Sequence, residues 1–285
     1  MTPADLTVPE VAFDTPADMR PPSERIGEQI AVLSITRHGV ATAGRIVAAL
    51  PEAQLFAPEK FRREALEQQR SACVYEGRTA DVIGELFAAG YGAMVAVLSL
   101  GALVRMIAPH LKDKTRDPAI IALDEGGRFA IPVLSGHLGG ANSLAVRLAK
   151  VLDAQAVLTT ASDSRATLAV DLLGRELGWT LDASHEALVH AAAAVVNDEP
   201  VAIVQEAGEA DWWTRHADGR TGPLPANLVR VASPQEIDPA RFAALLWISR
   251  RPLPANLAQT FSGRCVAYRL PGDGSDTARP SGEAS

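Results

Sequence analysis

The chain has 285 residues, of which 47% are hydrophobic, so it has material for one large or two small folded cores. Its formal net charge of -7 argues against a nucleic-acid partner, because phosphate binding needs a basic face. Two distant cysteines, Cys73 and Cys265, form neither a disulfide framework nor a zinc-ligand spacing. The sequence shows neither a signal-peptide pattern nor an apolar run near the roughly 20 residues of a membrane span, so the expected compartment is the cytoplasm.

The first part of the chain predicts alternating strands and helices. Residues 1–28 are proline-rich without apolar periodicity, which predicts a flexible N-terminal extension. An apolar run at 30–36 ends in Arg37-His38-Gly39, and helical spacing follows from 40 to 50. The next predicted elements are a strand at 54–57, a helix at 79–89 with Thr79 as N-cap and Gly90 as its stop, a buried strand at 93–100 and a helix at 102–111.

The strand at 119–124 and the strand at 129–134 are joined by a short glycine turn, which predicts an antiparallel hairpin. A helix at 143–152, a strand at 156–160 and a helix at 168–177 follow. Beyond these, the pattern predicts a helix at 184–196 and strands at 200–205, 228–232, 243–249 and 264–270.

The predicted fold class is therefore α/β: a mainly parallel sheet with one antiparallel hairpin, flanked by helices, plus a second smaller α/β domain. We expect the first domain at 29–166, the middle domain at 167–271 and a disordered tail at 272–285.

The stretch Leu134–Asn142, which reads LSGHLGGAN, lies between a predicted strand and a predicted helix. Gly136, Gly139 and Gly140 allow close backbone approach, and the first turn of the following helix is expected to offer unpaired N–H groups to an anion. The stretch therefore predicts an anion-binding turn, to which Ser135, His137 and Asn142 add polar side chains.

The hairpin has a geometric consequence for three loops. Once the chain reverses direction, loops that follow strands lie at the sheet edge where loops that follow helices lay before. We therefore expect the loops 112–118, 135–142 and 159–163 to lie on the same edge of the sheet.

His137 is the candidate general base or acid; alternatively, it only hydrogen-bonds the turn. Ser135 is a candidate nucleophile, but no G-x-S-x-G pattern surrounds it, so a capping or ligand-binding hydroxyl is favoured. On the neighbouring loop, Lys112, Lys114 and Arg116 are either anion ligands or simply solvated.

For the other candidate site residues, a purely structural role is the alternative to ligand binding. Asp117 precedes a proline and can act as a turn cap only. Thr159, Thr160 and Asp163 can be capping residues or ligands, and Arg105 is ordinarily a surface charge. His38 follows the first strand with a weaker glycine setting. Trp212 and Trp213 either form a stacking surface or anchor their loop.

Five segments in order resemble a known family, CbiG, the cobalt-precorrin-5A hydrolases of cobalamin biosynthesis. The segments are 101–109 (GALVRMIAP), 114–119 (KTRDPA), 124–129 (DEGGRF), 134–142 (LSGHLGGAN) and 159–163 (TTASD). The half that follows Asp163 is similar to the family's middle domain.

The resemblance implies a hydrolase that opens the δ-lactone of a ring-contracted corrinoid, (cobalt-)precorrin-5A, and releases acetaldehyde to give (cobalt-)precorrin-5B. The substrate's carboxylate arms would be held by Arg105, Lys114, Arg116 and the N–H groups of the glycine turn, with Gly136, Gly139 and Gly140. The other expected substrate-binding residues are Asp117, Asn142, Thr159, Thr160 and Asp163. His137, with Ser135 beside it, would act on the lactone. No resident cofactor or metal is implied, because cobalt would enter with the substrate.

The chain departs from the fuller family pattern, since members often continue into a C-terminal domain and this sequence ends in a polar tail past Leu270. We expect that piece to be a separate homologue or dispensable. Two alternatives stay open: a non-catalytic corrinoid-binding or scaffold protein that serves other cobalamin-pathway enzymes, and a generic phosphate-binding α/β protein. The second lacks both common phosphate-loop spacings.

Overall fold

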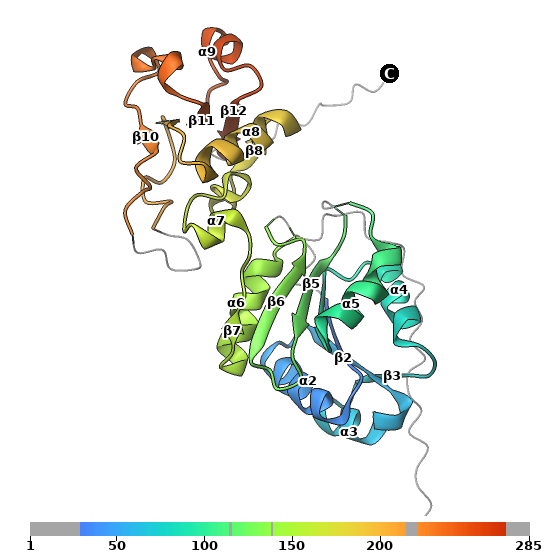
Figure 1. Cartoon of the computed structure of the whole chain (residues 1–285). Coiled ribbons are helices and arrows are strands. Elements are labelled where there is room, and N and C mark those ends of the chain that lie inside the picture. The colour runs from blue at the N-terminus through green and yellow to red at the C-terminus, as the bar shows by residue number, and fades with distance from the viewer. Residues whose placement is uncertain (1–28, 114–115, 138, 215–221, 272–285) are drawn as a thin grey trace, which may run out of the picture. The chain divides into compact units, whose positions relative to one another are not determined.

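A computed structural model describes residues 29–113, 116–137, 139–214 and 222–271. The chain divides into two compact units between Leu158 and Thr159, whereas the sequence places this boundary after residue 166 (Figure 1). The segments expected as an N-terminal extension and a disordered tail, 1–28 and 272–285, lie outside the described residues.

The first unit contains a sheet that, in the described part of the chain, has seven strands in the order β3-β2-β1-β4-β5-β6-β7. Neighbouring strands are parallel except for β5 and β6, which are antiparallel. The strands are β1 (Ile30–Ser34), β2 (Ala53–Pro58), β3 (Cys73–Tyr75), β4 (Ala93–Val97), β5 (Ala119–Leu123), β6 (Phe129–Leu134) and β7 (Gln155–Ala156). This arrangement confirms the predicted mainly parallel sheet with one antiparallel hairpin.

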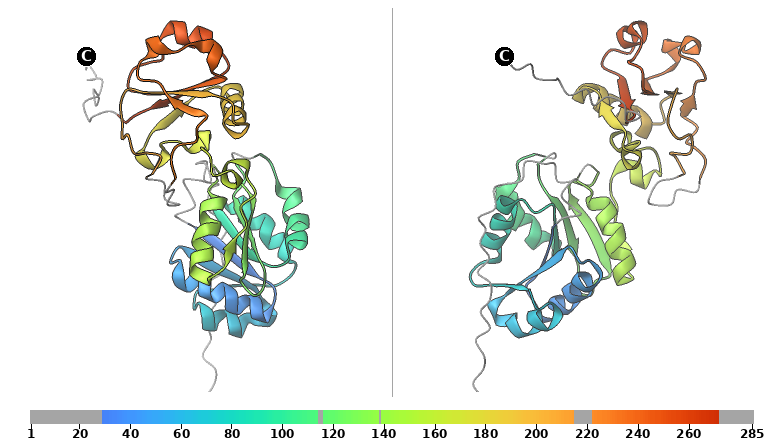
Figure 2. Two further views of the ribbon diagram at one scale, coloured as in Figure 1. Left: turned by 60° about the vertical axis from the view of Figure 1, so that its left-hand side comes forward. Right: turned by 180° about the vertical axis from the view of Figure 1, so that it is seen from behind.

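Helices cover both faces of this sheet (Figure 2). Successive side chains of a strand point to opposite faces, so Val32 packs on one core and Leu33 on the other. Helices α2 (Arg37–Ala49), α3 (Arg62–Gln68) and α6 (Ala141–Leu152) pack on the first face, and α4 (Thr79–Ala89) and α5 (Leu100–Ile107) on the second. Burial on both faces explains why β1, β4 and β5 read as continuous apolar runs.

The β5–β6 hairpin turns at Gly127, whose φ of 65° is a conformation that glycine adopts readily. Asp124 closes the turn, since its Oδ1 accepts hydrogen bonds from the amides of Arg128 at 2.7 Å and Phe129 at 2.8 Å. Because β6 runs back along β5, Leu134 at its end pairs with Ile120 at the start of β5. The loop after β6 therefore lies at the edge where β5 begins.

The second unit contains a smaller sheet, for which the described residues give the strand order β10-β9-β11-β12-β8. Strand β8 is antiparallel to β12 and the other pairs are parallel. The strands are β8 (Thr180–Asp182), β9 (Val201–Gln205), β10 (Leu228–Arg230), β11 (Ala244–Ser249) and β12 (Cys265–Arg269), and the helices are α7 (Ala161–Ser164), α8 (His185–Val196) and α9 (Ala255–Thr260). Its largest buried side chains include Trp247 and Tyr268.

Two predicted elements differ in the structure. The expected strand at 156–160 is only the two-residue β7 (Gln155–Ala156), and residues 157–160 carry no strand. The expected helix at 168–177 is wrong: two 3₁₀ turns occupy Val170–Leu172 and Arg175–Leu177, because Gly174 between them has a φ of 74° that a right-handed helix cannot continue through. Thr79 is the first residue of α4 rather than its N-cap, whereas Gly90 ends that helix as predicted, with a φ of 78°.

Candidate functional site

Two of the three loops predicted to share a sheet edge are joined by hydrogen bonds. The Ser135 hydroxyl donates to the backbone carbonyl of Asp117 at 2.8 Å. The Asp117 carboxylate, which is buried, accepts the amide of Lys112 at 3.0 and 3.2 Å. The placement of loops 112–118 and 135–142 on one edge is therefore confirmed, and Asp117 is the residue through which they meet.

The glycine turn is tightly packed against itself. Ser135 has a φ of 56° and Gly140 a φ of 81°, so the backbone enters the left-handed region at both ends of the turn. A β-carbon on Gly139 would lie 2.2 Å from Ser135 Cβ, and one on Gly136 would lie 2.8 Å from Asn142 Oδ1. Glycine is therefore needed at these two positions because the backbone there lies too close to Ser135 and Asn142 for a β-carbon.

Three amides of the turn donate to carbonyls within it, which corrects part of the expected anion site. The N–H of Gly140 donates to His137 O at 2.9 Å, that of Ala141 to Ser135 O at 3.1 Å and that of Asn142 to Gly136 O at 3.0 Å. The compact turn brings its own carbonyls to the first turn of α6. These amides are therefore not offered to a ligand, which leaves the cationic side chains as the candidate anion ligands of this edge.

His137 lies half-buried in the middle of the turn, and Asn142 is buried beside Gly136. Because the Ser135 hydroxyl donates its proton to a carbonyl, its geometry supports the capping reading that the sequence favoured over a nucleophile. Among the polar side chains of the turn, His137 thus stays the candidate for acid–base chemistry.

The structure describes two of the three cationic residues of the neighbouring loop. Lys112 and Arg116 are exposed on the loop, and Lys114 lies outside the described residues. Asp117, expected among the ligands, instead caps the loop, because its carboxylate is 7% exposed and accepts a backbone amide. The turn-capping alternative holds for that residue.

Arg105 does not join this edge. Its guanidinium Nη1 donates to Gly101 O at 2.9 Å, one turn earlier in α5. Long side chains on a helix point back toward its N-terminus, so the charge lies toward the edge where β4 ends and α5 begins. That edge is opposite the one that carries the glycine turn, and Arg105 is removed from the predicted site.

The third predicted loop belongs to the second unit. Thr160 stands at the N-cap position of α7, and its hydroxyl hydrogen-bonds the Asp163 carboxylate, while Thr159 is exposed. Their place on the common edge stays a prediction. In the same unit, Trp212 and Trp213 are both buried with their rings edge to face, so they anchor their loop and do not form an open stacking surface.

A second edge of the first sheet emerges from the topology. Strands β1 and β4 are neighbours in the sheet. The chain passes from β1 to β2 on one side and from β4 to β5 on the other, so the connections that follow β1 and β4 run in opposite directions. Thr36 caps α2 there by accepting the amide of Gly39 at 3.1 Å, and its hydroxyl hydrogen-bonds the Glu125 carboxylate. His38 is exposed next to them. The sequence around His38 gives only a weak signal, because the strand order that brings Glu125 to Thr36 beside it is not visible there.

The described residues contain no group of three or more His, Cys, Asp or Glu side chains arranged to hold a metal ion. In the same part of the chain, none of the helices combines the length and apolar character needed to cross a membrane.

The fold and the joined loops define a two-unit α/β protein with a histidine and cations on one edge of its first sheet. Residues 81–163 match the family described as "Cobalamin synthesis G N-terminal", and residues 168–269 match "Cobalamin biosynthesis central region". The chain belongs to this CbiG family and carries its N-terminal and central regions, which confirms the resemblance read from the sequence.

Two relatives are named cobalt-precorrin-5A hydrolase. The chain is 40% identical over 223 residues to one from Priestia megaterium, covering 78% of this chain and 58% of that protein. It is 39% identical over 150 residues to one from Salmonella typhimurium strain LT2, covering 53% and 40%. A crystal structure assigned as a cobalamin biosynthesis protein G homologue from Sulfolobus solfataricus aligns with a TM-score of 0.42 and 18% identity, over 87% of this chain and 62% of that one. The chain thus spans less than two thirds of the length of the relatives it matches.

Proposed function

We propose that this protein is a hydrolase of cobalamin biosynthesis that opens the δ-lactone of a ring-contracted (cobalt-)precorrin-5A and releases acetaldehyde, giving (cobalt-)precorrin-5B. The names of two relatives at about 40% identity support the reaction. The observation that carries the site is the hydrogen-bonded pair of loops, which brings His137 to the edge that also bears Lys112 and Arg116.

Substrate binding follows from the charges on that edge. A corrinoid carries acetate and propionate arms, which are carboxylates, and exposed Lys and Arg side chains bind carboxylates through charge-assisted hydrogen bonds. Arg116 can form the bidentate contact, while Lys112 contributes a point charge whose backbone is held by Asp117. The rigid turn beside them would fix the orientation of the ring.

In the proposed reaction His137 takes a proton from water, and the hydroxide adds to the lactone carbonyl. The acyl C–O bond then breaks, leaving a carboxylate on the ring and an alcohol on the extruded two-carbon unit. The alcohol then loses its proton and the C–C bond to the ring breaks, so that the two-carbon unit leaves as acetaldehyde. The electron pair of that bond stays on the conjugated ring, which takes up a proton. Cobalt, where present, belongs to the substrate, and we propose no resident cofactor.

The test is acetaldehyde release from the purified protein with the lactone substrate, measured by coupling to an NADH-dependent alcohol dehydrogenase. General acid–base catalysis contributes about 100- to 10,000-fold in rate, so His137→Ala should lose at least about 100-fold in kcat while still binding the corrinoid. His38→Ala is the matched control, because His38 follows a strand of the same sheet but lies on the opposite edge.

Three other outcomes of this assay would contradict parts of the proposal. Full activity in His137→Ala contradicts the general-base role. Loss of activity in His38→Ala alone would move the chemistry to the edge that holds Thr36 and Glu125. Tight corrinoid binding without acetaldehyde release would favour a scaffold protein that needs a further domain or partner enzyme to act.

A further inference from the structure

The second sheet has its own reversal of strand order. Strand β9 leads to β10 on one side, and the chain then crosses β9 to place β11 and β12 on the other. The connections that leave β9 and β11 therefore run in opposite directions. In open α/β sheets a crevice forms at the carboxyl ends of two such strands, and ligands bind there. Here those ends are Gln205 and Ser249.

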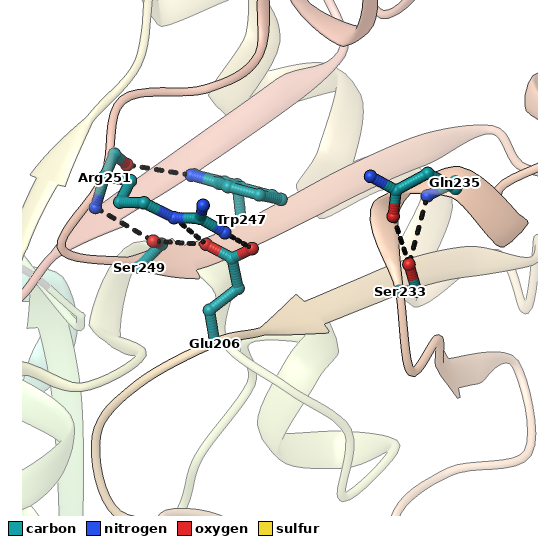
Figure 3. A network of polar contacts seen from close by, with 6 residues as sticks. All are labelled: Glu206, Ser233, Gln235, Trp247, Ser249 and Arg251. Atoms are coloured by element: carbon teal, nitrogen blue, oxygen red, sulfur yellow. Dashed lines mark hydrogen bonds and ion pairs between the residues drawn. The ribbon is translucent and has the colours of Figure 1, made fainter.

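A polar network joins the residues that follow both strands (Figure 3). The Glu206 carboxylate accepts hydrogen bonds from the Ser249 hydroxyl at 2.7 Å and from Arg251 Nε at 3.2 Å, and Arg251 Nη2 binds its other oxygen. The Arg251 amide donates to Ser249 Oγ at 2.9 Å, and Trp247 Nε1 donates to the Arg251 carbonyl at 3.2 Å. The side chains at this crevice are thus held in place before any ligand arrives.

A cavity of about 330 Å³ opens beside the network. Its volume is at the lower end of the range of roughly 300–1,000 Å³ that small-molecule sites occupy, so it suits a small molecule or one arm of a larger one. Three prolines and Trp247 form apolar walls, and the amides of Gln235 and Asn256 join Glu206 and Arg251 as the polar groups.

The charges in this cavity balance. The hydrogen bond from Arg251, joined by that from Ser249, holds the pKa of the Glu206 carboxyl below its ordinary value, so Glu206 stays ionised opposite the cationic Arg251. An anionic ligand would meet the charge of Glu206, and a cationic one that of Arg251. A neutral ligand avoids both costs.

The hydrogen-bonding groups of the cavity indicate which kind of neutral ligand it would take. The Ser233 hydroxyl donates to Gln235 Oε1, which leaves the Nε2 end of that side chain as a donor, and Figure 3 shows this end directed toward Trp247 and Arg251. Glu206 supplies acceptor lone pairs. A neutral group that has both a carbonyl and an N–H supplies a partner for each of them.

We propose that the cavity at the carboxyl ends of β9 and β11 is a second ligand site, which takes a neutral carboxamide or cyclic amide. The carbonyl of the ligand accepts from Gln235 and its N–H donates to Glu206, between the proline walls. The site does not depend on the proposed hydrolysis, since it lies in the second unit and uses none of the same residues.

The test uses the full chain and the indole N–H signals of a ¹⁵N–¹H spectrum. The chain has four tryptophans, so Trp247→Phe assigns the signal of Trp247 by its disappearance. Titration with 2-pyrrolidone or nicotinamide should shift that signal to saturation with a millimolar or tighter Kd, as expected for ligands of few atoms. Propionate and propylammonium, as charged probes, should not.

Gln235→Leu removes the donor, and loss of one hydrogen bond predicts a Kd about three- to tenfold weaker for the amide probe. Gln259→Leu is the matched control, because Gln259 is an exposed amide on α9 that does not line the cavity, and its Kd should equal that of the unmodified protein. Saturable binding of propionate in place of the amides overturns the neutral class. An unsaturable response to every probe, or an unchanged Kd in Gln235→Leu, overturns the site.

Discussion

At Gly139, a β-carbon would lie 2.2 Å from Ser135 Cβ and 2.6 Å from the Ser135 carbonyl oxygen. Both neighbours are fixed by the turn, so the backbone itself would have to move. We expect Gly139→Ala to lower the free energy of unfolding by about 1–3 kcal/mol, the usual cost of overpacking. Because the same turn carries His137, the variant should also lose corrinoid affinity. Urea unfolding followed by fluorescence measures the first effect.

Gly101→Ala is the control for that substitution. Its β-carbon would approach only Arg105 Nη1, at 3.4 Å, and that side chain is exposed and flexible. Since Gly101 lies in α5, where alanine is the better helix former, the free energy of unfolding should stay unchanged or rise slightly. An equal loss in both variants would mean that the turn is not specifically constrained.

Tyr268 gives a prediction that depends on pH. Its ring is buried and its hydroxyl donates to Val170 O at 2.7 Å, and burial raises the pKa of the phenol well above its ordinary value of about 10. The folded protein keeps the phenol neutral while the unfolded chain ionises it above pH 10. The stability that Tyr268 contributes is therefore present below pH 10 and is lost as pH rises beyond it.

We expect Tyr268→Phe to cost about 0.5–1.5 kcal/mol at pH 7 through the lost hydrogen bond, and the gap between the two proteins to narrow above pH 10. Urea unfolding at pH 7 and at pH 11 compares the two directly. A constant gap across this range would contradict a neutral buried phenol.

The sequence predicts the place of a functional residue when that place depends only on the strand or loop that carries it. The glycine cluster and the chain reversal are enough to place Ser135 beside the 112–118 loop. The direction of the Arg105 side chain and the choice between the capping and ligand roles of Asp117 are not decided in this way, because each depends on a local hydrogen bond to a nearby backbone group. The hydrogen bonds that the amides of Gly140, Ala141 and Asn142 donate within the turn are likewise not predictable, because they depend on the shape of the folded turn.

At the scale of elements, the β5–β6 hairpin determines which loops share an edge, and Asp124 holds its turn. We expect Asp124→Ala to cost about 1–3 kcal/mol, because its carboxylate accepts two backbone amides and the Arg128 guanidinium at 3.0 Å. Glu85→Ala, at an exposed position on α4, should change the free energy of unfolding by less than about 0.5 kcal/mol. Chemical denaturation of both variants at pH 7 is the measurement.

The same carboxyl makes the hairpin sensitive to acid. Burial disfavours ionisation of Asp124, but the hydrogen bonds from Arg128 and Phe129 outweigh it and hold the pKa below its ordinary value. The stabilisation is therefore present above the ordinary pKa of about 3.9 and lost as pH falls toward the lower folded value. The difference between the unmodified protein and Asp124→Ala should shrink at pH 3.

Long, strongly patterned elements are predictable from sequence, and short ones are not. The buried strands β1, β4 and β11 are continuous apolar runs, and α8 (His185–Val196) differs from the expected 184–196 only in that Ser184 is its N-cap. Strands β3 and β8 have three residues each, which is too few for an alternation to show. Their existence follows from neighbouring strands that offer free edges, which is tertiary information.

At the scale of the whole molecule, each unit combines parallel strands with one antiparallel partner, and each reverses its strand order once. In the first unit that reversal lies between β1 and β4, whereas the hairpin puts the glycine turn at the opposite edge. The proposed catalytic edge is therefore not the edge where open α/β sheets ordinarily bind ligands. The paired substitutions of His137 and His38 decide between these two edges of a single sheet.

The two units have separate cores. Among the described residues, two hydrophobic clusters lie wholly within 30–158 and two wholly within 168–270. A domain with its own core can fold alone, so fragments 29–158 and 159–271 should each show a cooperative unfolding transition. In the full chain, Tyr268→Phe should lower amide-exchange protection in β9 and β11 and leave β1 and β4 unchanged. An equal fall in β1 and β4 would show that the units unfold as one, because destabilising one core would then open both.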